Sequence, residues 1–304
     1  MKRGRAVKKK YLYLLITGLA LIAALPVVIL MCFTGESTDI RPDSVMYKGV
    51  EYAYKDFLTG CILSELQTLD EPPSDKTTEG VNAVATALDC SLRYLCKAGK
   101  SLDGGYPCLE YICEKEGLQH FGAELSVYRK YAEKSAEYAM SQNFTVSGTA
   151  VFLPVCRISS GALISPEDSG NPYVKKLYCE KDKTADYYKG SCQLTADGIA
   201  EIMLTEYPSL IIPPDESKWI SNIRRDSDGN VLRLDVCGIN MSCEEFRRLF
   251  DIRSPSFEMN YTQRLYSFDI RGDGCNTGMS VYSAVKLAER GYSALQILEE
   301  FYNL

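Results

Sequence analysis

Apolar residues recur with helical spacing at both ends of the patterned part of the chain. They fall three and four positions apart over residues 54–66, and again over 81–95 and 124–141. Near the C-terminus the same spacing predicts a helix around 284–288 that ends at Gly291. Ser293 and Gln296 then have the spacing of a capping box for a last helix. We therefore expect helices at the beginning and at the end of this region.

The middle of the chain has the pattern of short strands. Residues 144–155 form short apolar runs, and 266–270 predict a further strand. Residues 219–224 and 231–236 alternate around the turn sequence 226–230, which is typical of a β-hairpin. Short helices are expected at 199–204 and from the capping box at 242–245 to residue 250. Helices before and after a strand-rich middle favour an α+β fold for a single domain spanning 50–304.

The N-terminal segment has the pattern of a membrane anchor. Residues 11–33 contain no charge, and a helix of that length rises about 34 Å, enough to cross a bilayer core. Residues 1–10 carry six cations and no acid, which predicts a cytoplasmic N-terminus. We expect a basic tail (1–10), an uncleaved transmembrane signal anchor (11–33), a stalk (34–49) and an extracytoplasmic domain at the cell membrane. Signal cleavage is the alternative.

The charged residues limit the function classes that remain. The chain has a net charge of −6, and beyond the basic tail 28 cations face 40 anions, a net charge of −12. This balance argues against a broad basic surface for nucleic acid. The only histidine is His120, so a two-histidine metal centre is excluded, and acid-base chemistry is expected to depend on carboxylates.

The twelve cysteines leave two interpretations open. Eleven lie beyond Cys32, at scattered spacings. They are either small buried apolar residues or members of one or two disulfides. Cys108, Cys113 and His120 have a weak zinc-binding spacing, so a structural zinc is an alternative to the expectation of no cofactor.

One acid falls on an apolar stripe of a predicted helix. At about 100° per residue, Tyr54, Leu58, Cys61 and Glu65 lie in one line. Burying an ionised carboxylate is costly, so the pKa of Glu65 should rise, and a carboxyl group with a raised pKa donates a proton at neutral pH. The alternative is that Glu65 points into solvent near the helix end or pairs with Arg93.

Six segments, in order along the domain, resemble the stage II sporulation protein D family, also called the amidase-enhancer family. The first two are helical, and the last is long and fairly specific. They are YKDFLTGCILSEL (54–66), EGVNAVATALDCSLRYL (79–95), ISSGALIS (158–165), NPYVKKLYCEKD (171–182), EEFRRLFDIRSPSFEM (244–259) and GDGCNTGMSVYSAVKLAERGYSALQILEEFY (272–302).

This resemblance implies a membrane-anchored lytic transglycosylase that cleaves peptidoglycan strands stripped of stem peptides during engulfment of the forespore. Glu65 occupies the position of the family's catalytic acid. The resemblance also implies two partners, an amidase that removes stem peptides and a multi-pass membrane protein. The positions that line the family's substrate cleft correspond here to Ser159, Ser160, Gly161, Gly278, Met279, Ser280 and Tyr282.

The chain departs from the family pattern at several positions. Cys275-Asn276 replaces the histidine and second glycine of a Gly-His-Gly motif, and Arg157 replaces a histidine. Val281, Ala162 and the second-helix segment 82–84 also differ. These departures leave two further hypotheses: a glycan-binding scaffold that activates a partner amidase without cutting, or an unrelated anchored domain.

Overall fold

The structure is a computed structural model that describes residues 41–104 and 109–304, and the second of its two units, Arg41–Leu304, contains all of them. The predicted basic tail and membrane anchor, with the first part of the stalk, lie outside the described residues. Among the helices within the described ranges, none is both long and apolar enough to cross a membrane.

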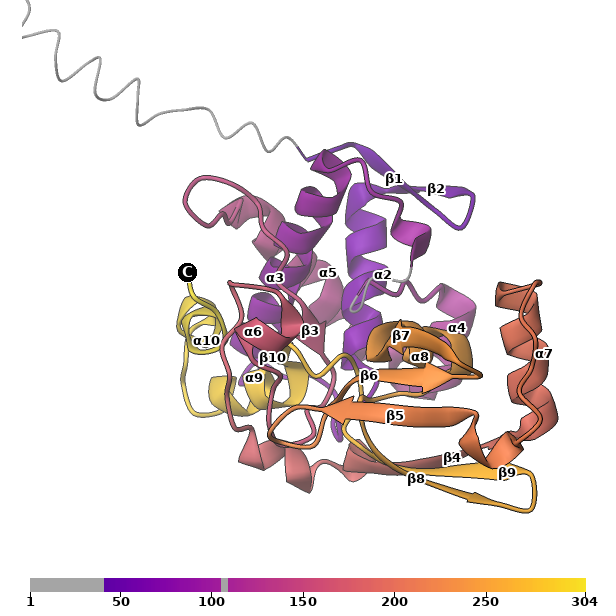
Figure 1. Ribbon diagram of the computed structural model, residues 1–304. Coiled ribbons are helices and arrows are strands. Elements are labelled where there is room, and N and C mark those ends of the chain that lie inside the picture. The colour runs from indigo at the N-terminus through magenta and orange to yellow at the C-terminus, as the bar shows by residue number, and fades with distance from the viewer. Residues whose placement is uncertain (1–40, 105–108) are drawn as a thin grey trace, which may run out of the picture. The chain divides into compact units, whose positions relative to one another are not determined.

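Helices from the two ends of the chain pack together (Figure 1). The N-terminal helices are α2 (Tyr54–Leu66), α3 (Thr78–Lys97), α4 (Glu114–Phe121) and α5 (Leu125–Gln142). The C-terminal helices α9 (Val281–Ala288) and α10 (Ala294–Phe301) lie against α3. A hairpin of β1 (Ser44–Tyr47) and β2 (Val50–Ala53) precedes α2, and α6 (Pro166–Ser169) is a single turn.

The middle of the chain forms two antiparallel three-stranded sheets. In the first, β9 (Leu265–Arg271) lies between β4 (Lys189–Thr195) and β8 (Ser256–Thr262). In the second, β6 (Val231–Val236) lies between β5 (Ile220–Arg225) and β7 (Ile239–Ser242). Two helices, α7 (Ala196–Glu206) and α8 (Cys243–Phe250), accompany these sheets. The predicted mixed α+β fold is confirmed.

Two separate hydrophobic cores result from this arrangement. One joins the N- and C-terminal helices, and the other joins the two sheets with α7 and α8. The second core contains four phenylalanine rings, with centroids of Phe246 and Phe250 5.0 Å apart and those of Phe257 and Phe268 5.4 Å apart. The chain passes from the first core to the second between Tyr188 and Cys192 and returns between Ile270 and Cys275. Within the first core, β3 (Val155–Cys156) and β10 (Met279–Ser280) pair in parallel.

The predicted strand at 144–155 is mostly irregular, apart from its last residue in β3 and a bridge between Val146 and Thr149. Side chains of α3 satisfy the backbone here in place of a neighbouring strand. The Leu153 amide donates to Ser91 Oγ at 2.8 Å, and the Ser91 hydroxyl donates to the Leu153 carbonyl at 3.0 Å. The helices predicted at 54–66, 81–95 and 124–141 and the 219–236 hairpin are confirmed.

The described cysteines behave as small apolar residues. Seven of the ten are buried, and no disulfide joins two of the ten. Cys108 lies outside the described residues. Within the described ranges, no three His, Cys, Asp or Glu side chains are grouped to hold a metal ion.

Gly278 allows β10 to approach β3. Its φ is +77°, and a side chain there would overlap the carbonyl oxygen of Pro154, which accepts a hydrogen bond from the Met279 amide at 3.1 Å. Gly148 has a similar φ of +79°, with open space around it.

Gly278→Ala and Gly148→Ala are therefore a matched pair for unfolding in denaturant. Both substitutions place a side chain at positive φ, which costs about 1 kcal/mol. Only Gly278→Ala adds the overlap with Pro154, so we expect it to lower the free energy of unfolding by roughly 1–3 kcal/mol more. Equal losses in the two variants would show that β3 and β10 can separate freely.

Candidate functional site

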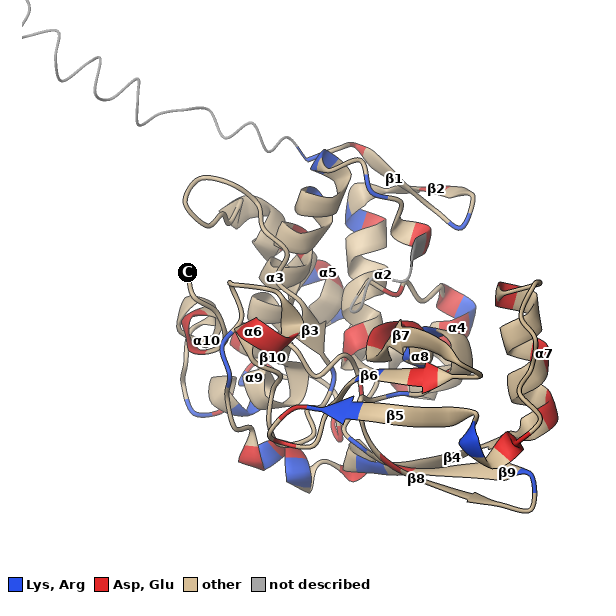
Figure 2. Cartoon of the chain, viewed as in Figure 1, with Lys and Arg blue, Asp and Glu red and all other residues tan. Residues whose placement is uncertain are grey.

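A charged cleft of about 550 Å³ lies where the two cores meet. The helical part contributes Glu65 and, directly after β3, Arg157, and the returning chain contributes the loop 273–275. The strand-rich part contributes α8 and residues 251–253. Acidic and basic residues are interspersed on the elements around it, as on α8 (Figure 2). The lining is mainly polar, which suits a ligand with many hydroxyl or amide groups.

Glu65 lies in the last turn of α2, at the wall of this cleft. The helix is buried on all sides, since every residue from Phe57 to Leu66 is buried, and Glu65 itself is only 3% exposed. Its Oε2 atom is buried with no hydrogen-bond partner among the described residues. An unpartnered buried carboxylate oxygen is costly, so this oxygen favours carrying a proton.

Burial is the main reason why the pKa of Glu65 is raised from 4.5 to about 8. The charges of Glu110 and Asp273 raise it further, whereas those of Arg157 and Arg247 act to lower it. The carboxyl group is therefore mostly protonated at neutral pH, while a nearby guanidinium can stabilise the carboxylate once the proton has left. A group with this balance can act as an acid and then as a base.

Both alternatives for Glu65 are wrong. The side chain does not point into solvent, because it is buried in the cleft wall. Arg93 is committed elsewhere, with its Nε 3.0 Å from Asp89 Oδ2, and Asp89 also pairs with Arg41 at 2.9 Å. Arg93 is therefore paired with Asp89 on its own helix and not with Glu65, which lines the cleft.

Arg157 connects the end of α2, next to Glu65, to the segments that contain Asp273 and Glu110. Its guanidinium donates to the Ser64 carbonyl at 3.0 Å, to Asp273 Oδ1 at 3.1 Å and to Glu110 Oε2 at 2.7 Å. Burial acts to lower the pKa of Arg157, but the surrounding carboxylates, Glu65 among them, outweigh burial and raise it. The arginine stays charged and holds the end of α2 against the loop that contains Asp273.

The serines expected in the cleft lie in a buried network beside it. The Ser159 amide donates to Asp182 Oδ2 at 2.7 Å, and Ser283 Oγ donates to Asp182 Oδ1 at 2.5 Å. Ser280 caps α9, where its Oγ accepts from the Ser283 amide at 3.2 Å. Ser160 Oγ accepts from the Asn276 amide group at 2.7 Å. These bonds connect the segment at 159–160 to Asp182 and Asn276, and Asp182 to the start of α9.

The other expected residues are also structural in this arrangement. Gly161 has a φ of +99°, Gly278 lies against Pro154, and Met279 is fully buried in β10. Tyr282 is the exception, because it lines two other cavities, and its hydroxyl donates to Asp70 Oδ2 at 2.9 Å. Of the eight residues singled out from the sequence, the described lining of this cleft includes Glu65 and none of the other seven.

Arg157, Asp273 and Glu110 were not predicted from the sequence to belong to the site. Arg157 and Cys275 had a detectable signal, since both stand at departures from the family pattern and both line the cleft. Burial raises the pKa of Cys275 to about 12, so its thiol stays protonated and is a poor nucleophile. His120 is exposed on α4 and does not line the cleft. Carboxyl chemistry at Glu65 therefore remains the best candidate.

Comparison with known proteins does not identify the chain: no family model matches it, and no curated protein matches it.

The raised pKa of Glu65 gives a test that needs no substrate. Between pH 4.5 and 8 the folded state keeps a proton on Glu65 that the unfolded state has lost, so the folded state binds more protons. This contribution to the free energy of unfolding is complete below pH 4.5. It is lost as pH rises towards 8, by about 1.4 kcal/mol per pH unit. Denaturant unfolding of the full-length chain across this range should show the slope.

Glu65→Gln should remove this slope, because the amide does not titrate. Glu133→Gln, which removes an exposed acid on α5, is the control and should keep it. If Glu65→Gln and the unaltered chain change in parallel with pH, the carboxyl group is not held protonated by burial.

Proposed function

We propose that this protein is a lytic transglycosylase that cleaves the glycan strands of peptidoglycan, with Glu65 as its general acid and base. The observation that carries the proposal is a carboxyl group at a cleft wall, buried to 3% exposure, whose pKa is raised to about 8 and whose Oε2 has no partner among the described residues. The resemblance in sequence supports the same residue and the same chemistry.

In the proposed reaction Glu65 first donates its proton to the glycosidic oxygen, and the bond from that oxygen to the sugar carbon breaks. The resulting carboxylate then removes a proton from a hydroxyl of the muramyl residue. That hydroxyl oxygen bonds to the same sugar carbon, which leaves an anhydro-sugar end and returns Glu65 to its protonated form. No water is consumed, so a second carboxylate at the spacing of a glycoside hydrolase is not required.

The biological setting of the proposal comes from the sequence. The uncharged segment at residues 11–33 is the expected anchor in the cell membrane, and the resemblance implies a role in engulfment during sporulation. Its substrates would then be strands already stripped of stem peptides by an amidase, and its partners would be that amidase and a multi-pass membrane protein.

A specific observation favours a second candidate function. Arg157 and Cys275 both replace residues of the family pattern, and both line the cleft beside Glu65. A scaffold that binds glycan and activates an amidase needs the cleft for binding. It does not need the residues that cleave the strand, so these can differ from the family pattern. Detection of anhydro products separates these two candidates.

The main test is the product formed from peptidoglycan whose stem peptides have been removed. The full-length chain should release anhydro-muramyl ends, and Glu65→Gln should lower the rate by roughly 10²–10⁴-fold while strand binding persists. Glu133→Gln is again the control and should cut normally. Binding without any product would favour the scaffold, and neither binding nor product would contradict both functions.

The rate of cleavage should fall at high pH, and the pH at which it falls should depend on Arg157. Because the first step needs protonated Glu65, the rate should fall as pH rises through about 8. The charge of Arg157 lowers the pKa of Glu65, so Arg157→Gln should move this fall to higher pH, whereas Arg157→Lys should leave it nearly in place. An unchanged alkaline limb in Arg157→Gln would show that Arg157 does not act on Glu65 through its charge.

A further inference from the structure

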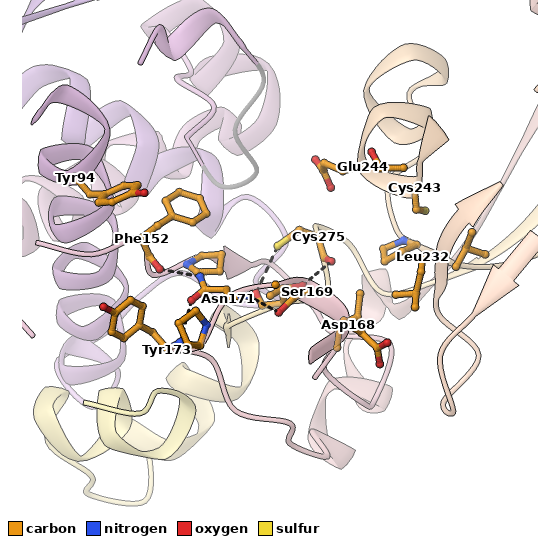
Figure 3. Close-up of a pocket in the computed structure, with 18 of the residues that line it drawn as sticks. Tyr94, Phe152, Asp168, Ser169, Asn171, Tyr173, Leu232, Cys243, Glu244 and Cys275 are labelled. Atoms are coloured by element: carbon orange, nitrogen blue, oxygen red, sulfur yellow. Dashed lines mark hydrogen bonds between the residues drawn. The ribbon is translucent and has the colours of Figure 1, made fainter. Parts of the chain in front are cut away.

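A second cavity, of about 490 Å³, lies next to the candidate cleft and has a different lining. The helical side presents aromatic rings, from Tyr94, Phe152 and Tyr173, and the strand-rich side presents Leu232 and Cys243 (Figure 3). The Tyr94 and Phe152 rings are 6.3 Å apart and tilted by 44°, and both are partly exposed. The sequence reasoning did not single out these residues.

The second cavity borders the cleft that contains Glu65. Glu244 and Cys275 line both spaces, and of two consecutive residues Pro154 lines the second cavity while Val155 lines the cleft. In Figure 3, Cys275 lies between the aromatic side and Cys243 on the opposite side. A linear chain that passes Glu65 would therefore reach the aromatic side without leaving the junction between the two cores.

The aromatic side is held in place by one amide side chain. Asn171 donates from Nδ2 to the Phe152 carbonyl at 2.9 Å, and its Oδ1 accepts from the Tyr173 amide at 3.0 Å. The backbones that carry two of the three rings are thus tied together before any ligand arrives. A backbone that is already ordered loses little conformational freedom on binding, which favours affinity.

The chemistry of this lining fits a carbohydrate. A pyranose ring has an apolar face of C–H groups that packs on an aromatic ring, and polar groups at its edge. Here Lys100 Nζ lies 5.7 Å from the centroid of the Tyr94 ring, and Asp168 and Ser169 are further polar residues of the lining. Apolar aromatic surface with a few polar groups is the usual composition of a small-molecule pocket.

We propose that this cavity binds further sugar residues of the same glycan strand that Glu65 cleaves. The inference rests on the proposed function and extends it, because the affinity of the protein for a glycan strand would then depend on the length of the strand. Short fragments fill the cleft alone, whereas longer ones also contact Tyr94 and Phe152 and bind more tightly.

The test is the binding of peptide-free glycan fragments of increasing length to the full-length chain carrying Glu65→Gln, which prevents turnover. Titration calorimetry should show affinity rising with length until both spaces are filled. Adding Phe152→Leu and Tyr94→Leu should lower affinity for long fragments by about tenfold and leave short fragments unaffected. Leucine keeps an apolar contact with the core, so these variants should fold.

Tyr178→Ala is the matched control, because this tyrosine is 66% exposed and lines neither space. Equal affinity for all lengths, or a length dependence that survives both leucine substitutions, would overturn the inference while fragment binding and product release still supported the proposed function. Binding of an aromatic compound in the second cavity without competition from long glycan would also overturn it. If no fragment of any length binds and no strand is cut, the proposed function fails as well.

Discussion

Burial of one carboxyl group against a fixed guanidinium is the interaction on which the site depends. Ionisation of Glu65 is costly, because residues 57–66 of its helix are all buried and its Oε2 has no hydrogen-bond partner among the described residues. Arg157 is held in place by Ser64, Asp273 and Glu110, so its charge stays near the carboxyl group. Burial outweighs that charge, and the acid remains protonated at neutral pH.

The placement of two cores creates the space that this acid faces. Helices from both ends of the chain form one core, and the sheets between them form the other. The chain passes between the cores at residues 188–192 and 270–275, and the backbone at Ser159 and Ser160 beside the second passage is fixed by the buried side chains of Asp182 and Asn276. The serines and glycines near these crossings therefore serve the architecture, while the charged residues beside them line the cleft.

The local sequence was a good guide to the elements and a partial guide to the site. Helical spacing predicts α2, α3 and α5 because their apolar positions are close in sequence, and the capping residue of α8, Ser242, works as expected. The segment 144–155 failed as a strand because Ser91, some sixty positions earlier, bonds its backbone. The spacing of apolar residues along the chain does not predict a hydrogen-bond partner so far away in sequence.

From the sequence alone, the single histidine was determined by counting. The α+β composition and an acid among apolar residues of a helix were also determined, since helices and strands depend on neighbours within a few positions. Tertiary structure alone brought Arg157 and Asp273 to Glu65 and joined the cleft to an aromatic cavity. These residues lie about ninety and two hundred positions beyond Glu65. Their proximity follows from how the crossings pack between two cores, and packing over such separations leaves no periodic signal in the chain.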